Sequence, residues 1–251
     1  MAFYAYCLLR LPSQQEWPIL RGVSGHPVFP FRCCGRYTTL LSHLDRDFPF
    51  TARSIVEHGQ VISRAFEMHT VLPMRFGTFF QSEKQIEDLI RENQRELLET
   101  FCRLRGKAEM RLKLHFPSTE KCDTVAKKSP QKSRSSLNRD ILAEPEAIDP
   151  SRQAMAEQCA AWLRETFQPL EDHVCCRQLS DRKLVVDCAH LIESRRVEIY
   201  RQLCSLAANQ IKDCALRMSG PWPPYHFLPT SMRLPAAPLR PLRSQPAFAA
   251  Q

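Results

Sequence analysis

The spacing of apolar and polar positions predicts a mixture of strands and helices at the start of the chain. Residues 3–10 and 37–44 have the apolar pattern of strands, and residues 51–69 fit a helix. The apolar side chains that share one side of this helix are Ile55, Ile62, Ala65 and Phe66. Strands interspersed with helices indicate an α+β unit.

A second helix and a strand are predicted farther along. Ser82 and Gln85 have the spacing of a capping box, so we expect a long helix from Ser82 to about Arg105, ended by Gly106. In residues 108–116 apolar and polar side chains then alternate, which is typical of a half-buried strand. The apolar side comprises Met110, Leu112, Leu114 and Phe116, and the polar side Glu109, Arg111, Lys113 and His115.

The stretch TVLPMRFGTFF, residues 70–80, is predicted to be a strand, because Pro73 and Gly77 disfavour a helix and its aromatic residues favour a sheet. Arg75, Gly77 and Phe79 would then share one side. Gly77 allows a bulge or the close approach of another backbone, and Arg75 can pair with a carboxylate. A structural use of each residue is the alternative.

The second half repeats this mixture of elements. Asp149 and Pro150 are expected to cap and open a helix, which two strands at about 171–179 and 183–192 follow as a hairpin. Another helix is predicted from Ser194 to about Arg217. We therefore expect a second α+β unit in which helices cover one face of an antiparallel sheet.

The stiff aromatic stretch SGPWPPYHF, residues 219–227, follows that helix. Gly220 and Pro221 are expected to end it, and Pro223-Pro224 favours an extended path. Trp222 and Tyr225 are thus presented on a backbone that costs little entropy to order, as a recognition surface requires. The alternative is that Trp222 packs into its own domain, followed by an edge strand at 225–228.

Charge and composition divide the chain further. The net charge is +8, of which residues 127–136 carry four positive charges and the tail after Leu228 carries three, with no acidic residue in either. We predict an N-terminal α+β domain at 1–116, a basic low-complexity linker at 117–148, a C-terminal α+β domain at 149–228 and a Pro/Arg-rich disordered tail at 229–251. The folded parts are then nearly neutral.

Cysteine usage favours free thiols. The eleven cysteines lie mostly in apolar periodic segments, where free cysteine behaves as a small hydrophobic residue. The adjacent pairs Cys33-Cys34 and Cys175-Cys176 lack the two-to-four-residue spacing of zinc sites. The nearest metal-like constellation lies on the two predicted hairpin strands and is better explained by packing: His173, Cys175, Cys188 and His190. We expect no metal and no cofactor.

No motif for catalysis or export is found. The sequence has no Gly-rich phosphate loop or nucleophile elbow, and His58 is the best lone catalytic candidate, with a solvated or capping histidine as the alternative. No apolar run is long enough to cross a membrane, and the first residues lack a signal-peptide pattern, so we expect a cytoplasmic protein that is not an enzyme. A competing hypothesis is an RNA-binding module that stacks bases on Phe76 and Phe80.

Five stretches carry a family resemblance. In order they are YAYCLLR, EHGQVI, VLPMRFGTFF, GKAEMRLKL and SGPWPPYHF, and they extend from Tyr4 to about Leu228. Together they resemble the gas vesicle synthesis proteins of the GvpL/GvpF family. The signature positions are Pro73, Gly77, Gly106, Glu109, Gly220, Pro221, Pro223 and Pro224. The basic linker and the tail fall outside the resemblance.

The resemblance implies a non-enzymatic accessory or minor structural protein of gas vesicles. It also implies two α+β domains, one of them similar to a ferredoxin-like fold. The implied partners are the hydrophobic shell protein GvpA and other gas vesicle proteins, and the implied location is the gas vesicle, or the cytoplasm during its assembly. We hypothesise that Arg75, Phe79, Trp222 and Tyr225 contact such partners.

Overall fold

The computed structural model describes residues 2–11, 17–115, 150–170, 173–177, 184–211 and 215–232. These residues group into two compact units. One lies within Met1–Met110, Leu191–Arg195 and Gly220–Gln251, and the other within Arg111–His190 and Arg196–Ser219. Each unit therefore takes in segments that are far apart in the sequence. The predicted linker at 117–148 and nearly all of the predicted tail lie outside the described residues, so the predicted domain boundaries stay a prediction.

The first sheet contains six strands in the spatial order β2-β3-β4-β1-β5, with β6 also paired to β1. They are β1 (Ala2–Arg10), β2 (Leu20–Arg21), β3 (Pro27–Cys33), β4 (Tyr37–Leu44), β5 (Val71–Pro73) and β6 (Phe79–Phe80). The pairs of β1 with β4, β5 and β6 are antiparallel, as are β2 with β3 and β3 with β4. Because β1 is central, nearly all of its side chains are buried.

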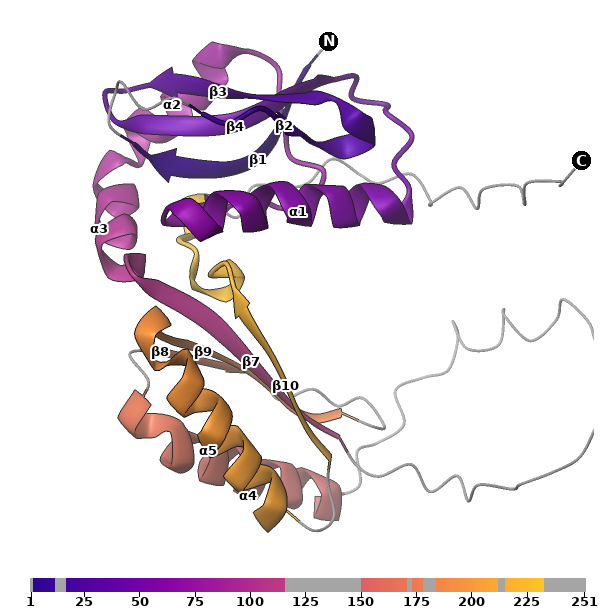
Figure 1. Cartoon of the computed structure of the whole chain (residues 1–251), viewed down its shortest axis with the longest axis vertical. Coiled ribbons are helices and arrows are strands. Elements are labelled where there is room, and N and C mark those ends of the chain that lie inside the picture. Colours follow the sequence, from indigo (N-terminus) through magenta and orange to yellow (C-terminus); the bar gives the residue numbers. More distant parts are fainter. Residues whose placement is uncertain are drawn as a thin grey trace, which may run out of the picture. The chain divides into compact units, whose positions relative to one another are not determined.

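Three helices accompany this sheet: α1 (Ala52–Met68), α2 (Glu83–Glu92) and α3 (Gln94–Leu104). Helix α1 runs along one face of the sheet (Figure 1) and buries Val61, Ile62 and Ala65 against it. Its first turn is closed by a capping box between Thr51 and Ser54. The core lies between α1 and β1.

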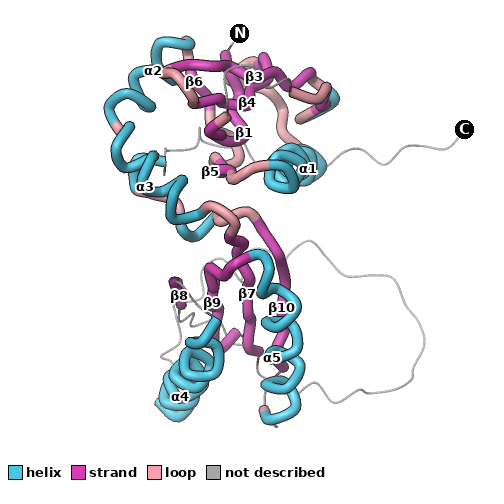
Figure 2. The backbone as a smooth tube through the Cα atoms, turned by 60° about the vertical axis from the view of Figure 1, so that its left-hand side comes forward, coloured by secondary structure: helices cyan, strands magenta, loops and turns pink. Residues whose placement is uncertain are grey.

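The second sheet has the strand order β10-β7-β9-β8. Its strands are β7 (Lys107–His115), β8 (His173–Arg177), β9 (Leu184–Glu193) and β10 (Ala215–Trp222), and its helices are α4 (Pro150–Phe167) and α5 (Val197–Gln210). Both helices pack on this sheet (Figures 1 and 2). On β9, Asp187 is buried and accepts hydrogen bonds from the Arg111 guanidinium of β7.

The predicted α+β class is confirmed, and so are the strands at 3–10, 37–44 and 108–115 and the helices that begin near residues 51 and 150; Phe116, the last residue of the third predicted strand, lies outside the described residues. The predicted hairpin corresponds to β8 and β9, which are neighbours in the sheet. The predicted cap Asp149 lies outside the described residues. Strands β2 and β3 were not predicted, because Pro27 and Pro30 disrupt the strand pattern there.

Two predicted elements are interrupted. Residues 70–80 do not form one strand, because Gly77 takes a φ of 84° and Thr78 N donates to Arg75 O, so that a turn separates β5 from β6. The long helix expected at 82–105 is broken at Asn93, where φ is −112° and ψ is 16°. The Ser82 side chain accepts from Gln85 N as expected, but the Gln85 side chain accepts from Gln81 N rather than completing the capping box.

The end of the described chain also differs from the prediction. Helix α5 ends at Gln210, and Ala215–Trp222 forms β10 beside β7, so Gly220 and Pro221 lie in a strand and do not end a helix. Residues Tyr225–Phe227 form a 3-10 helix instead of an edge strand. Pairing with β7 outweighs the local helical pattern, and that pairing spans about a hundred residues of sequence.

Candidate functional site

The first unit contains a groove of about 890 Å³ between α1, the segment Ile19–Arg21 and the two exposed aromatic residues Trp222 and Tyr225. Its volume is within the usual range for ligand pockets. The residues that line it are Ile19, Leu20, Arg21, Val56, Gly59, Gln60, Val61, Ser63, Arg64, Glu67, Trp222 and Tyr225.

Helix α1 forms one wall because its two sides differ in character. Ile62 and Ala65 on one side enter the core, and Val61 belongs to both the core and the groove lining. Val56, Gly59, Ser63 and Glu67 recur every three or four residues and line the groove. Helix α1 thus contributes side chains both to the core and to the groove wall.

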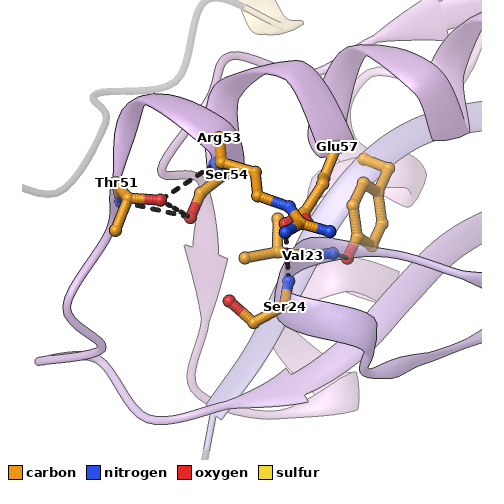
Figure 3. Close-up of polar contacts among 7 residues, drawn as sticks. Val23, Ser24, Thr51, Arg53, Ser54 and Glu57 are labelled. Atoms are coloured by element: carbon orange, nitrogen blue, oxygen red, sulfur yellow. Dashed lines mark hydrogen bonds and ion pairs between the residues drawn. The ribbon is translucent and has the colours of Figure 1, made fainter. Parts of the chain in front are cut away.

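The segment before β3 forms the second wall and is tied to α1 by hydrogen bonds (Figure 3). Ser24 N donates to Glu57 Oε2 at 2.7 Å, and Glu57 Oε1 accepts from Arg53 Nε at 2.8 Å. Val23 N donates to the hydroxyl oxygen of the buried Tyr6 at 3.0 Å. These contacts place Ile19–Arg21 beside α1.

A close approach at Gly22 supports the same wall. A Cβ atom at this position would lie 1.9 Å from Tyr6 Oη and 2.9 Å from Val28 Cγ2. Only glycine leaves room for the Tyr6 ring there. The chain therefore passes directly over the core immediately after the groove-wall residues 19–21.

A buried carboxylate holds the third wall. Glu109 on β7 is only 2% exposed, and it accepts from His226 N at 2.9 Å and pairs with His226 Nδ1 at 2.6 Å. Arg103 Nη2 donates to Phe227 O at 2.7 Å. A Cβ atom on Gly220 would lie 2.8 Å from Glu109 O, so glycine allows the two backbones to approach. These contacts fix the segment that carries Trp222 and Tyr225.

Four apolar side chains of the groove are strongly exposed: Ile19 (97%), Val56 (58%), Trp222 (43%) and Tyr225 (39%). Tyr225 is the least exposed of the four, and its partial burial, together with nearby Cys7 and Glu109, raises its pKa to about 12. The charged lining residues Arg21, Arg64 and Glu67 leave one excess positive charge. The arrangement is suited to non-covalent binding of an apolar surface.

His58 has a structural role in this unit. It is buried, its Nδ1 atom lies 2.8 Å from the Tyr4 hydroxyl, and its Nε2 atom lies 3.1 Å from Met74 O. The Met74 carbonyl can only accept, so Nε2 carries a proton, and in the neutral ring Nδ1 then accepts from the Tyr4 hydroxyl. Burial lowers the pKa of His58 to about 4. His58 is thus neither solvated nor a helix cap.

The other predicted site residues lie away from the groove. Arg75 is exposed in the turn between β5 and β6, and Phe79 packs in the core, where it contacts the Tyr4 ring. Pro73 pairs with Cys7 in the sheet, and Gly106 takes a φ of 70° directly before β7. Trp222 and Tyr225 are therefore the two hypothesised contact residues that the structure brings together.

Sequence reasoning missed several groove residues. Ile19 and Arg21 belong to a segment whose strand was not predicted, and Glu109 was placed on a polar face although it is buried. Among these residues, Gly59 is the one that the sequence could have indicated, because a glycine inside a predicted helix is unfavourable and often has a packing or functional role. The RNA-binding hypothesis loses its support, since Phe80 is buried and Phe76 packs against the core.

Cysteine chemistry differs from the prediction at one position. Cys188 forms a disulfide bond, so the expectation of reduced thiols is wrong for it, because a sequence does not show which cysteines meet in space. Free cysteines include Cys7, Cys33, Cys34, Cys102, Cys159 and Cys204. Within the described part of the chain, no group of three or more His, Cys, Asp or Glu residues has a geometry that could hold a metal ion. The side chains of His173 and Cys175 lie outside that part.

A family model described as gas vesicle synthesis protein GvpL/GvpF matches residues 2–229. Gas vesicle protein F1 of Halobacterium salinarum is 22% identical over 195 residues, which cover 76% of each chain. Gas vesicle protein F of a Streptomyces species is 24% identical over 239 residues, covering 91% of this chain and all of the relative.

Solved structures show a similar fold. The crystal structure of gas vesicle protein GvpF from Microcystis aeruginosa has a TM-score of 0.70 at 18% identity, and covers 93% of this chain and 99% of its own. GvpF from Anabaena sp. PCC7120 also has a TM-score of 0.70, at 20% identity, with 90% and 97% covered. At this level of identity the likeness supports the fold.

Proposed function

The chain belongs to the gas vesicle synthesis protein GvpL/GvpF family, and on that premise we propose that it is an accessory or minor structural protein of gas vesicle assembly. It binds the hydrophobic shell protein GvpA and other gas vesicle proteins. It resides in the gas vesicle, or in the cytoplasm while the vesicle is assembled. The family is one of gas vesicle proteins and is not a known enzyme family.

One observation supports this binding role above all: Trp222 and Tyr225 are exposed beside Ile19 and Val56 in a single groove. Aromatic side chains held in a fixed position supply much of the energy of protein interfaces. The hydrogen bonds of Glu109 hold the two aromatic residues in place before any partner arrives, which lowers the entropic cost of binding. A shell subunit with a strongly apolar surface needs such a partner before assembly.

The groove has the chemistry of a binding surface. Of the described residues that line it, none is a histidine or a cysteine, and its ionisable groups are two arginines, one glutamate and one tyrosine. The protein therefore acts by holding its partner. None of the helices within the described ranges is both long and apolar enough to span a membrane.

The test is capture of GvpA from solution by the full chain and by its Trp222→Ala variant. We expect the variant to capture far less GvpA, because it loses an aromatic contact from the groove. Leu206→Ala is the matched control, since Leu206 is an exposed apolar residue on α5 that does not line the groove. Undiminished capture by a correctly folded Trp222→Ala variant would reject the groove as the binding surface.

A further inference from the structure

We infer that the groove binds an amphipathic α-helix of the gas vesicle shell protein, which presents aliphatic side chains to Trp222 and Tyr225 and a carboxylate to Arg64 and Arg21. This inference rests on the proposed function and specifies the conformation and charge of the bound segment. Four features of the groove support it: its length, the glycine in its helical wall, its short strand and its charge.

The groove has the dimensions of a short helix. Along α1 it extends from Val56 to Glu67, and at 1.5 Å per residue this corresponds to about 16 Å, or three helical turns. Its apolar lining residues come from different walls, Val56 from α1 and Trp222 from the end of β10. A helix that lies between two such walls contacts both with the residues of one face, as in other helix-in-groove complexes.

Gly59 is unexplained by the packing of the chain itself. It lies in the middle of α1, where glycine is the least favourable residue after proline. A Cβ atom built there meets no heavy atom within 4 Å, so no neighbour in the chain requires a glycine. Because Gly59 lines the groove, its missing side chain leaves α1 open to the close approach of a partner backbone.

A strand added to the sheet fits the groove less well. The strand at the groove is β2, which contains only two residues, Leu20 and Arg21. Strand addition depends on a row of backbone hydrogen bonds, and very short edge strands are a recognised means of preventing it. The longer groove wall is helical, and its backbone groups already bond within α1.

The charges select an acidic partner. Arg64 and Arg21 line the groove with Glu67 as the single carboxylate among its described lining residues. Glu67 follows Arg64 by three residues on α1, and no ion pair joins the two in the structure, so an incoming carboxylate meets an excess of positive charge. Such a carboxylate fixes the register of a helix whose apolar contacts alone would let it slide.

The first experiment measures the dissociation constant of GvpA, fused to a soluble carrier, for the full chain and for Gly59→Leu. We expect Gly59→Leu to bind at least about tenfold more weakly. Its thermal midpoint should equal or exceed that of the unchanged chain, because leucine favours a helix over glycine. Ala208→Leu on α5 is the control, since it places the same side chain at an exposed helical position that does not line the groove. Binding by Gly59→Leu within twofold of the unchanged chain would overturn the inference.

The second experiment tests charge and conformation. Arg64→Glu should weaken GvpA binding by about tenfold, and one Glu→Lys or Asp→Lys variant of GvpA should restore it. An alanine scan of GvpA around that residue should show sensitive positions spaced by three and four residues. Sensitivity at every second residue would indicate that GvpA binds as a strand. Unchanged binding by Arg64→Glu would show that no carboxylate of GvpA contacts Arg64. Either outcome overturns the inference but not the proposal that the chain binds GvpA. If the unchanged chain does not bind GvpA, the proposed function fails as well.

Discussion

Glu109 gives the sharpest prediction, because its buried carboxylate joins β7 to the segment that carries the groove aromatics. It accepts hydrogen bonds from two donors of one residue, His226 N and His226 Nδ1, across 117 positions of sequence. In Glu109→Ala both donors lose their acceptor, which is a buried carboxylate, although the His226 side chain itself is partly exposed. Glu109→Gln keeps the shape and one oxygen, and the imidazole can change tautomer to accept from the amide.

The size of the effect follows from these two contacts. A hydrogen bond to a charged group contributes about 1.5–3 kcal/mol, and an unsatisfied buried donor costs a comparable amount. We therefore expect Glu109→Ala to lower the free energy of unfolding by about 3–5 kcal/mol. For Glu109→Gln we expect about 1 kcal/mol, since one strong contact survives and the other is replaced.

Urea denaturation measures the change in stability, and hydrogen exchange of residues 219–230 measures release of the segment. The matched control is Glu99→Ala, whose carboxylate forms an exposed ion pair with Arg95 and should change stability by less than about 0.5 kcal/mol. GvpA capture should fall with Glu109→Ala and persist with Glu99→Ala. If Glu109→Ala is as stable as the control and its 219–230 segment exchanges no faster, the buried carboxylate does not anchor the aromatic wall.

Three further variants test other parts of the fold. Burial lowers the pKa of His58 to about 4, so between about pH 6.5 and 4 the unfolded chain binds a proton at His58 and the folded chain does not. As pH decreases through this window, the free energy of unfolding should fall by about 3 kcal/mol more in the unchanged chain than in His58→Gln. Equal pH dependence of the two proteins would contradict the assignment. Gly220→Ala should lower the thermal midpoint more than Gly35→Ala, since both glycines have positive φ but only a Cβ atom on Gly220 meets backbone, at 2.8 Å; equal midpoints would contradict the close approach. Asp187→Asn should destabilise the chain to urea by about 2–4 kcal/mol, because it removes the charge that compensates the Arg111 guanidinium, and a change below about 0.5 kcal/mol would show that the pair contributes little.

Sequence patterns were sufficient where structure is local. The apolar run of β1 and the alternation of β7 identified two central strands, and the helical period identified α1. Patterns failed where a distant partner decides the outcome. Residues 215–217 continue the predicted helical pattern but begin the strand that pairs with β7, and Glu109 has a polar side chain but becomes buried against His226. The residues near each of these segments in the sequence do not reveal its distant partner.

One wall of the groove could be predicted from the sequence and the opposite wall could not, because only the first depends on local sequence. The prolines around Trp222 and Tyr225 indicated a stiff segment that presents aromatic residues, and the structure leaves both of them exposed. The opposite wall depends on the hydrogen bond from Ser24 N to Glu57, which joins segments 33 residues apart. That contact follows from the folded arrangement of the 3-10 turn Val23–Gly25 and α1, which the sequence pattern does not specify.

The most direct test of the central claim is the equilibrium affinity of the purified full chain for the shell protein GvpA, measured beside a Trp222→Ala/Tyr225→Ala double variant. Our account predicts saturable binding that weakens at least about thirtyfold in the double variant, because two exposed aromatic contacts of the groove are lost. Equal affinity of the two proteins, or no saturable binding by the unchanged chain, would contradict it.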